Sequence, residues 1–247
     1  MKYHLDTIPV WDALKQGGEC FLCNLEKRTE QLYTENYLGG AAMSPEVRER
    51  INEVGFCHRH FATLYAQRNR LPLALISHTY MRETSRELSK QYKKLPSPSK
   101  IKESAFSKKS SADGAIDDFI DFLSKKESSC LICEDLARTM DRYIYTAIYL
   151  ARTSSEFRGL LDNSQGLCLH HIKRSAEIAK DAFGSKGCAE WLNVVLPPTF
   201  KAMERLDGEI EWFTKKFDYR YREEPWGTSE DALVRVIAKL SGNNDLK

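Results

Sequence analysis

Apolar side chains recur along the chain at the spacing of an α-helix. In one stretch they fall at Leu136, Met140, Tyr143 and Ala147, in steps of four, three and four that place one stripe along a helix. No alternation of period two extends over the length of a strand, and no Asn-Gly or Asp-Gly turn joins two β-branched runs. The pattern therefore predicts an all-α fold.

One segment interrupts the helical pattern and divides the chain. Residues 94–114 are rich in Ser, Lys and Pro and poor in large apolar residues, which is typical of a linker. We therefore expect a first helical repeat over residues 1–93, the linker over 94–114, and a second helical repeat over 115–217. The remaining residues, 218–247, contain a Pro225-Trp226-Gly227 turn followed by a last amphipathic helix from Ala232.

The two sides of the linker repeat one arrangement of cysteine and histidine. Each side carries a Cys-x-x-Cys pair, starting at Cys20 and at Cys130, and a Cys-x-x-His pair, starting at Cys57 and at Cys168. The intervening segments contain 33 and 34 residues. Two nearly equal spacings are unexpected by chance, so the sequence contains an internal duplication.

Other landmarks recur in the same order. Ser44 and Ser154 lie between the pairs and are expected to cap a short helix, and Leu71-Pro72 and Leu196-Pro197 are expected to open a long one. Each repeat should contain a short helix before the Cys pair and a longer one after it. A second short helix, a helix opened by Cys-x-x-His and a final long helix should follow.

These cysteines and histidines are the ligands of a tetrahedral zinc site. A tight Cys-x-x-Cys turn brings two thiolates together, and Cys-x-x-His supplies a third thiolate and an imidazole one helical turn apart. We expect each repeat to close its own Cys₃His site, with two zinc ions per chain. The expected first site is Cys20, Cys23, Cys57 and His60, and the second is Cys130, Cys133, Cys168 and His171.

The repeat also separates the ligands from their neighbours. His58 follows its cysteine by one residue and His170 by two, so neither position recurs in both halves. Cys188 has no counterpart in the first half and is expected to be a small buried residue, while His4 and His78 lack partners.

Two other chemistries fit the same ligand types. Three thiolates and an imidazole could hold an iron–sulfur cluster, and clustered thiols could carry out thiol–disulfide exchange without metal. A c-type haem is disfavoured because Asn24 and Glu134, rather than histidines, follow the two Cys-x-x-Cys pairs. Zinc is the preferred interpretation.

On these residues the chain resembles a bacterial family of unknown function that has duplicated Cys-x-x-Cys and Cys-x-x-His motifs. The C-terminal Asp218-Tyr219-Arg220 and the following Glu224-Pro225-Trp226-Gly227 are similar to the ending of that family. The resemblance extends over essentially the whole chain and implies no activity.

Composition and charge indicate the class of protein and the compartment in which it is expected. Apolar residues make up 42% of the 247 residues and the net charge is +2, so no global field points to nucleic acid or to a membrane. No apolar run is long enough for a membrane span or a signal peptide, and we expect a cytoplasmic protein. A reducing compartment favours metal binding over disulfides for the seven cysteines.

No catalytic constellation accompanies the ligands. The sequence lacks a Gly-rich phosphate loop, a Gly-x-Ser-x-Gly elbow and a His-Glu-x-x-His motif, so no catalytic residue is assigned. The favoured function is a zinc-binding helical scaffold or adaptor for a protein partner. The alternatives are a thiol-based redox or metal sensor, an iron–sulfur or other metalloenzyme, and nucleic-acid binding through the basic stretch Arg82–Lys109.

Overall fold

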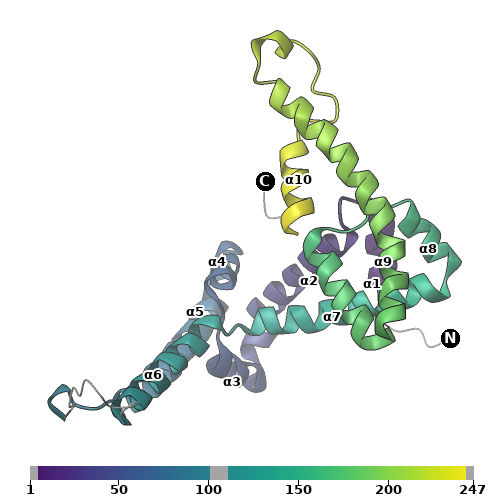
Figure 1. Cartoon of the computed structure of the whole chain (residues 1–247). Helices are drawn as coiled ribbons and strands as arrows, with labels where there is room; N and C mark the ends of the chain where they lie inside the picture. The colour runs from purple at the N-terminus through teal and green to yellow at the C-terminus, as the bar shows by residue number, and fades with distance from the viewer. Residues whose placement is uncertain (1–4, 101–110, 243–247) are drawn as a thin grey trace, which may run out of the picture. The chain divides into compact units, whose positions relative to one another are not determined.

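All regular structure in the described residues is helical. The computed structural model describes residues 5–100 and 111–242, and these contain ten α-helices, three short 3₁₀ helices and no strand (Figure 1). The predicted all-α fold is therefore confirmed for that part of the chain.

The helices follow a similar order on both sides of the predicted linker. Before the linker they are α1 (Thr7–Gln16), α2 (Phe21–Leu38), α3 (Pro45–Val54), α4 (His58–Ala66) and α5 (Arg70–Tyr92). After it they are α6 (Ser111–Ser128), α7 (Leu131–Thr153), α8 (Ser155–Asp162), α9 (Leu169–Lys215) and the additional α10 (Ala232–Ser241). The 3₁₀ helices are η1 (Gly40–Met43), η2 (Pro98–Lys100) and η3 (Tyr219–Tyr221).

The two expected serine caps are present. The backbone N–H of Val47 donates to Ser44 Oγ at the start of α3, and that of Phe157 donates to Ser154 Oγ at the start of α8. A side-chain oxygen at this position satisfies one of the N–H groups that a helix start leaves unpaired.

The expected helix start at Leu196-Pro197 is wrong. Pro197 and Pro198 lie inside α9, which instead changes direction at Gly184, where φ is 69°. Only glycine adopts that conformation at low cost, so Gly184 marks the break between the helix that follows Cys168 and the final long helix. Of the expected linker, residues 101–110 lie outside the described residues, and Ser111–Gly114 belong to α6.

Contacts within the chain define two compact units. Unit 1 contains Met1–Thr29 and Ala137–Lys247, and unit 2 contains Glu30–Leu136. The boundaries thus fall inside α2 and α7, whereas the sequence places the division at the linker. Each unit combines segments from both halves of the duplication.

Each unit has its own apolar core. In unit 2 the buried side chains include Ile51, Phe56, Leu64, Leu131 and Ile132, so the start of α7 packs with residues that precede and follow Cys57. In unit 1, α9 packs against α8 and α10. The fully buried Phe157 of α8 meets the ring of Trp11 edge-on at 5.0 Å.

Among the described helices, none combines the length and the apolar character that crossing a bilayer requires. The basic stretch Arg82–Lys109 is described only as far as Lys100. Within it, Arg86 forms an ion pair with Glu83 one turn earlier on α5.

Candidate metal centres

Site 1 lies wholly within unit 1 and joins the first Cys-x-x-Cys pair to the second Cys-x-x-His pair. Its four residues, Cys20, Cys23, Cys168 and His171, are all buried. His171 Nδ1 lies 3.6 Å from Cys20 Sγ, 3.4 Å from Cys23 Sγ and 3.2 Å from Cys168 Sγ. The sulfurs of Cys23 and Cys168 are 3.5 Å apart.

Site 2 lies wholly within unit 2 and has the same donor set. It joins Cys57 and His60 to Cys130 and Cys133. His60 Nδ1 lies 3.3 Å from Cys57 Sγ, 3.1 Å from Cys130 Sγ and 3.3 Å from Cys133 Sγ. The sulfurs of Cys57 and Cys133 are 3.9 Å apart.

These separations are close to those expected around a single ion, and five of the six sulfur–nitrogen distances are slightly shorter. With zinc–sulfur bonds of about 2.3 Å and zinc–nitrogen bonds of about 2.0–2.1 Å, ligand atoms on one tetrahedral ion lie about 3.5–3.8 Å apart. Distances of 3.5 and 3.9 Å between sulfurs are far too long for a disulfide, and all seven cysteines are free. Both donor sets fit one tetrahedral metal ion.

The eight expected ligands gather as two Cys₃His groups, but the expected partnering is wrong. Cys20 and Cys23 do not meet Cys57 and His60, and Cys130 and Cys133 do not meet Cys168 and His171. Each Cys-x-x-Cys pair instead joins the Cys-x-x-His pair of the other half.

Helix lengths explain the exchange of partners. The 18 residues of α2 carry the chain about 27 Å from the first Cys pair, and the 10 residues of α3 return at most about 15 Å. The 23 residues of α7 extend about 35 Å, and the eight of α8 return about 12 Å. Neither half brings its own Cys-x-x-His back to its starting point.

Helix starts position the ligands of both sites. Cys57 and Cys168 occupy the N-cap positions of α4 and α9, so the histidine three residues later faces the same side. The backbone N–H of His171 donates to Cys168 Sγ at 3.4 Å. Backbone N–H groups and the positive end of a helix favour the thiolate form that binds metal.

A glycine two residues before each of these cysteines permits a close approach. Gly55 and Gly166 have φ values of 76° and 71°. A Cβ atom at Gly55 would lie 2.3 Å from the ring of Tyr80, and one at Gly166 would lie 2.1 Å from the hydroxyl of Thr199. Both positions therefore require glycine for conformation and for space.

The backbone around Gly55 holds the second Cys pair beside Cys57. The N–H of Leu131 donates to the carbonyl of Gly55 at 3.0 Å, and the Ser129 hydroxyl donates to the carbonyl of Val54 at 2.7 Å. Residues on either side of Cys130 are thus tied to the segment that leads into Cys57. These two bonds form within unit 2 and fix the cross-half pairing of site 2.

A carboxylate lies near the histidine of each site. Glu30 Oε1 lies 2.7 Å from His60 Nε2 and also pairs with Arg59 at 2.8 Å. In site 1, Glu26 Oε2 lies 3.7 Å from His171 Nε2. With Nδ1 facing the sulfurs, the Glu30 contact keeps the Nε2 proton of His60 in place and makes Nδ1 a better ligand, whereas the Glu26–His171 separation is longer than a hydrogen bond. Neither glutamate belongs to a motif, so the sequence alone does not single out either one.

Replacing Glu30 with glutamine is expected to weaken metal binding at site 2 about 10- to 100-fold, as loss of such a carboxylate does in other metal sites. Competition with a chromogenic zinc chelator measures the change. Glu35→Gln, at an exposed position of the same helix, is the matched control and should leave the affinity unchanged. Equal affinities for the two variants would contradict the role assigned to Glu30.

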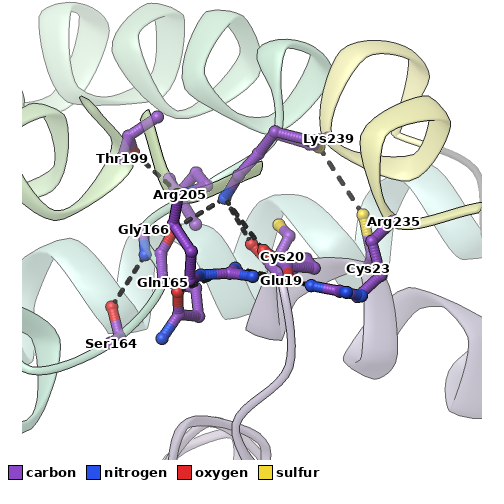
Figure 2. Close-up of polar contacts among 12 residues, drawn as sticks. Glu19, Cys20, Cys23, Ser164, Gln165, Gly166, Thr199, Arg205, Arg235 and Lys239 are labelled. Carbon is purple, nitrogen blue, oxygen red and sulfur yellow. Dashed lines mark hydrogen bonds and ion pairs between the residues drawn. The ribbon is translucent and has the colours of Figure 1, made fainter. Parts of the chain in front are cut away.

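Site 1 has a further support, a buried lysine, that has no counterpart at site 2 among the described residues. Lys239, on α10, is 1% exposed, and its Nζ donates to the carbonyls of Glu19 at 2.7 Å and Gln165 at 2.6 Å (Figure 2). Glu19 directly precedes Cys20, and Gln165 lies three residues before Cys168. One buried ammonium therefore ties the two ligand-bearing segments of site 1 together.

The surroundings of Lys239 are charged and paired. Glu19 accepts from Arg205 at 2.6 Å, and both residues lie near Lys239 (Figure 2). Arg205 also donates to Glu209, one turn further along α9, at 2.9 Å. Burial lowers the pKa of Lys239, while the negative charges of Glu19, Cys20 and Cys168 act in the opposite direction. A cation at this position would offset the net negative charge of three thiolates if they held a divalent ion.

Lys239→Met is expected to destabilise unit 1 by about 1–3 kcal/mol, because it leaves two buried carbonyls without a donor. Urea unfolding followed by circular dichroism measures the loss. Lys173→Met removes an exposed lysine of α9 and serves as the control, with an expected change within about 0.5 kcal/mol. A Lys239→Met protein as stable as the control would show that the two carbonyls do not depend on the ammonium.

The pKa values of the donor groups are shifted because the donor atoms lie close to one another. Burial works to lower the pKa of His60 and of His171, but hydrogen bonds to the neighbouring thiolates outweigh it, and both pKa values rise to about 10. Burial likewise opposes ionisation of Cys130, yet contacts with His60 and two backbone N–H groups bring the pKa of Cys130 to about 6.

The remaining thiols of each group resist ionisation. Burial and the adjacent Cys130 thiolate raise the pKa of Cys133 to about 12. In site 1, hydrogen bonds with Cys168 and Cys20 raise the pKa of Cys23. Burial works to raise the pKa of Cys20, but hydrogen bonds with Cys168, Cys23 and His171 outweigh it and lower that pKa. Three thiolates this close repel one another, so full ionisation needs a cation among them.

The other described histidines and Cys188 lie outside both Cys₃His groups. His58, His78 and His170 are exposed, and Cys188 is half-buried with its thiol donating to the carbonyl of Ala176 at 3.4 Å. His170 nevertheless lies close to Glu26 and His171. His4 lies outside the described residues.

Comparison with known proteins identifies a family but no activity. One family model, described as a family of unknown function (DUF6062), matches residues 1–247. No curated protein and no solved structure matches the chain.

Proposed function

Since the chain belongs to the DUF6062 family, whose function is unknown, we propose from the site geometry that it is a non-catalytic helical scaffold or adaptor held together by two structural zinc ions. The observation that carries this proposal is the pair of Cys₃His groups, each gathered around one point. The partner of such an adaptor would be another protein.

Closure of the ligand sets supports a structural role. A catalytic zinc site keeps one position for water or substrate and uses three protein ligands, whereas a structural site uses four. Both groups supply four, and the residues of site 1 are all buried. Each ion would join segments that are far apart in the sequence, such as Cys23 and Cys168.

The distances favour one ion over an iron–sulfur cluster. The ligands of a cluster bind different irons, so their donor atoms lie farther apart than donors that share one ion. Sulfur–nitrogen separations of 3.1–3.6 Å fit a shared ion. A set of three thiolates and one imidazole is also a common donor set for structural zinc.

Zinc binding would displace protons from both groups. His60 and His171, whose pKa values lie near 10, must release a proton from Nδ1, and the thiols of Cys23 and Cys133 must ionise. Affinity for zinc should therefore rise with pH through the neutral range.

Elemental analysis of the full chain, purified without added metal, tests the proposal. We expect about two equivalents of zinc per chain, and X-ray absorption at the zinc edge should show about three sulfurs and one nitrogen around each ion. Less than about one equivalent of any metal would overturn the metal-binding proposal. A visible charge-transfer spectrum with iron and sulfide would replace zinc with a cluster.

A further inference from the structure

The two metal groups differ in how far solvent reaches their sulfurs. In site 1, Cys20, Cys23 and Cys168 are all buried. In site 2, Cys130 is buried, Cys57 is half-buried and Cys133 is exposed. Since a thiolate must meet an oxidant directly to react with it, accessibility separates the two groups chemically.

The C-terminal helix contributes to the protection of site 1. The carbonyl of Gly242, the residue directly after α10, lies 3.2 Å from Cys23 Sγ. A Cβ atom at Gly242 would lie 3.2 Å from Cys168 Sγ, so the backbone itself covers two sulfurs of this site. Lys239 holds α10 in this position through its two carbonyl bonds.

Site 2 has no such cover among the described residues. Its two segments are joined by the Leu131 and Ser129 hydrogen bonds, which lie beside Cys130 and leave Cys133 open. Cys57 Sγ lies 3.9 Å from Cys133 Sγ, so a disulfide between them requires the two sulfurs to approach each other by about 1.9 Å.

From this asymmetry, and building on the proposed zinc binding, we propose that Cys133 is an oxidation site at which peroxide opens site 2 and releases its zinc while site 1 keeps its own. Site 2 is then the exchangeable, redox-sensitive centre of the protein and site 1 the permanent one.

The chemistry balances with hydrogen peroxide as the oxidant. With zinc bound, Cys133 would be present as a thiolate; this thiolate attacks one peroxide oxygen, the O–O bond breaks, and the products are a sulfenic acid at Cys133 and a hydroxide ion. The Cys57 thiolate then attacks Cys133 Sγ, the S–O bond breaks, and a second hydroxide leaves as the disulfide forms. Two thiolates lose two electrons in total, peroxide gains them, and Zn²⁺ departs because only Cys130 and His60 remain.

The test uses the full-length, zinc-loaded protein treated with hydrogen peroxide in the presence of a chromogenic zinc chelator. We expect about one of two equivalents to be released at least about tenfold faster than the other. Differential alkylation and mass spectrometry should locate a Cys57–Cys133 disulfide, and a thiol reductant with added zinc should restore the starting stoichiometry. Release of both ions at one rate, or first oxidation of Cys20, Cys23 or Cys168, would overturn the proposal.

Two variants sharpen the comparison. Cys133→His keeps four ligands at site 2 without an oxidisable sulfur at that position, and it should slow the fast release about tenfold. Cys188→Ser removes the cysteine outside both groups and should leave the release unchanged. If the untreated protein holds no zinc, the proposed function itself fails. If it holds two equivalents that oxidise together, only the present inference fails.

Discussion

Replacing His171 with alanine is expected to remove one zinc ion and most of the stability of unit 1, whereas replacing the adjacent His170 removes neither. His171 is 1% exposed and its Nδ1 faces three sulfurs, while His170 is exposed and lies outside the Cys₃His group. Without the imidazole, the three buried thiolates have neither a fourth ligand nor a proton donor.

The expected loss of stability is large because a bound ion contributes much of the folding free energy of the unit. A structural zinc site contributes on the order of 10 kcal/mol or more to folding, and a domain is stable by only about 5–15 kcal/mol in total. Loss of the ion therefore removes a large part of the free energy that stabilises the unit. We expect His171→Ala to lose the ordered start of α9 and to melt well below the parent protein.

Metal content per chain and thermal melting followed by far-ultraviolet circular dichroism measure the outcome for the parent, His171→Ala and His170→Ala. In unit 2 the same comparison uses His60→Ala against His58→Ala, since His58 is exposed and His60 is fully buried. If His171→Ala kept about two zinc ions and the melting temperature of His170→Ala, site 1 would not be a structural metal centre.

The candidate ligands stood out in the sequence because their chemistry is local. A Cys-x-x-Cys turn or a Cys-x-x-His helix start requires fixed spacing over four residues, and duplication marked the same positions twice. The serine caps at Ser44 and Ser154 were predictable for the same reason, since a cap depends on residues within one turn.

The partnering of the ligands depends on distances that local motifs do not contain. Nearness in sequence favoured closure within each half, but α3 and α8 each span less distance than the long helix before them, which disfavours a return to the first Cys pair. The lengths of α2 and α7 were implicit in the helical pattern, so the exchange could have been inferred by comparing the outward and returning helices in each half.

Residues that act through tertiary contacts left no signal. Lys239 donates to a carbonyl 220 residues away, and only the position of α10 shows which backbone groups it reaches. Glu26 and Glu30 look like ordinary exposed acids of a helix until the histidines that they contact are placed beside them. The helix break at Gly184 also went unrecognised, because prolines near 197 suggested a helix start nearer the C-terminus.

Two double variants are expected to show the exchanged partnering through metal content alone. Cys23→Ser combined with Cys168→Ser damages site 1 twice and should leave about one zinc ion per chain, bound at site 2. Cys23→Ser combined with Cys57→Ser damages both sites and should leave almost none. Closure within each half would give the reverse result, because Cys23 and Cys57 would then share a site.

The comparison is internally matched because each double variant removes two thiols and adds two hydroxyls of similar size. Serine is a poor zinc ligand, and a tetrahedral site that loses a thiolate binds its ion far more weakly. The single variants Cys23→Ser, Cys57→Ser and Cys168→Ser should each lose about one ion, which shows that every position counts before pairs are compared.

Measurement of zinc and of free thiols in the same samples distinguishes loss of metal from loss of protein. If the Cys23/Cys57 variant keeps about one ion and the Cys23/Cys168 variant keeps none, the two groups in the structure are wrong. The expected order instead requires Cys20 and Cys23 to be bound with Cys168 and His171. In that arrangement each zinc joins one half of the duplicated chain to the other, so neither half would complete a site by itself.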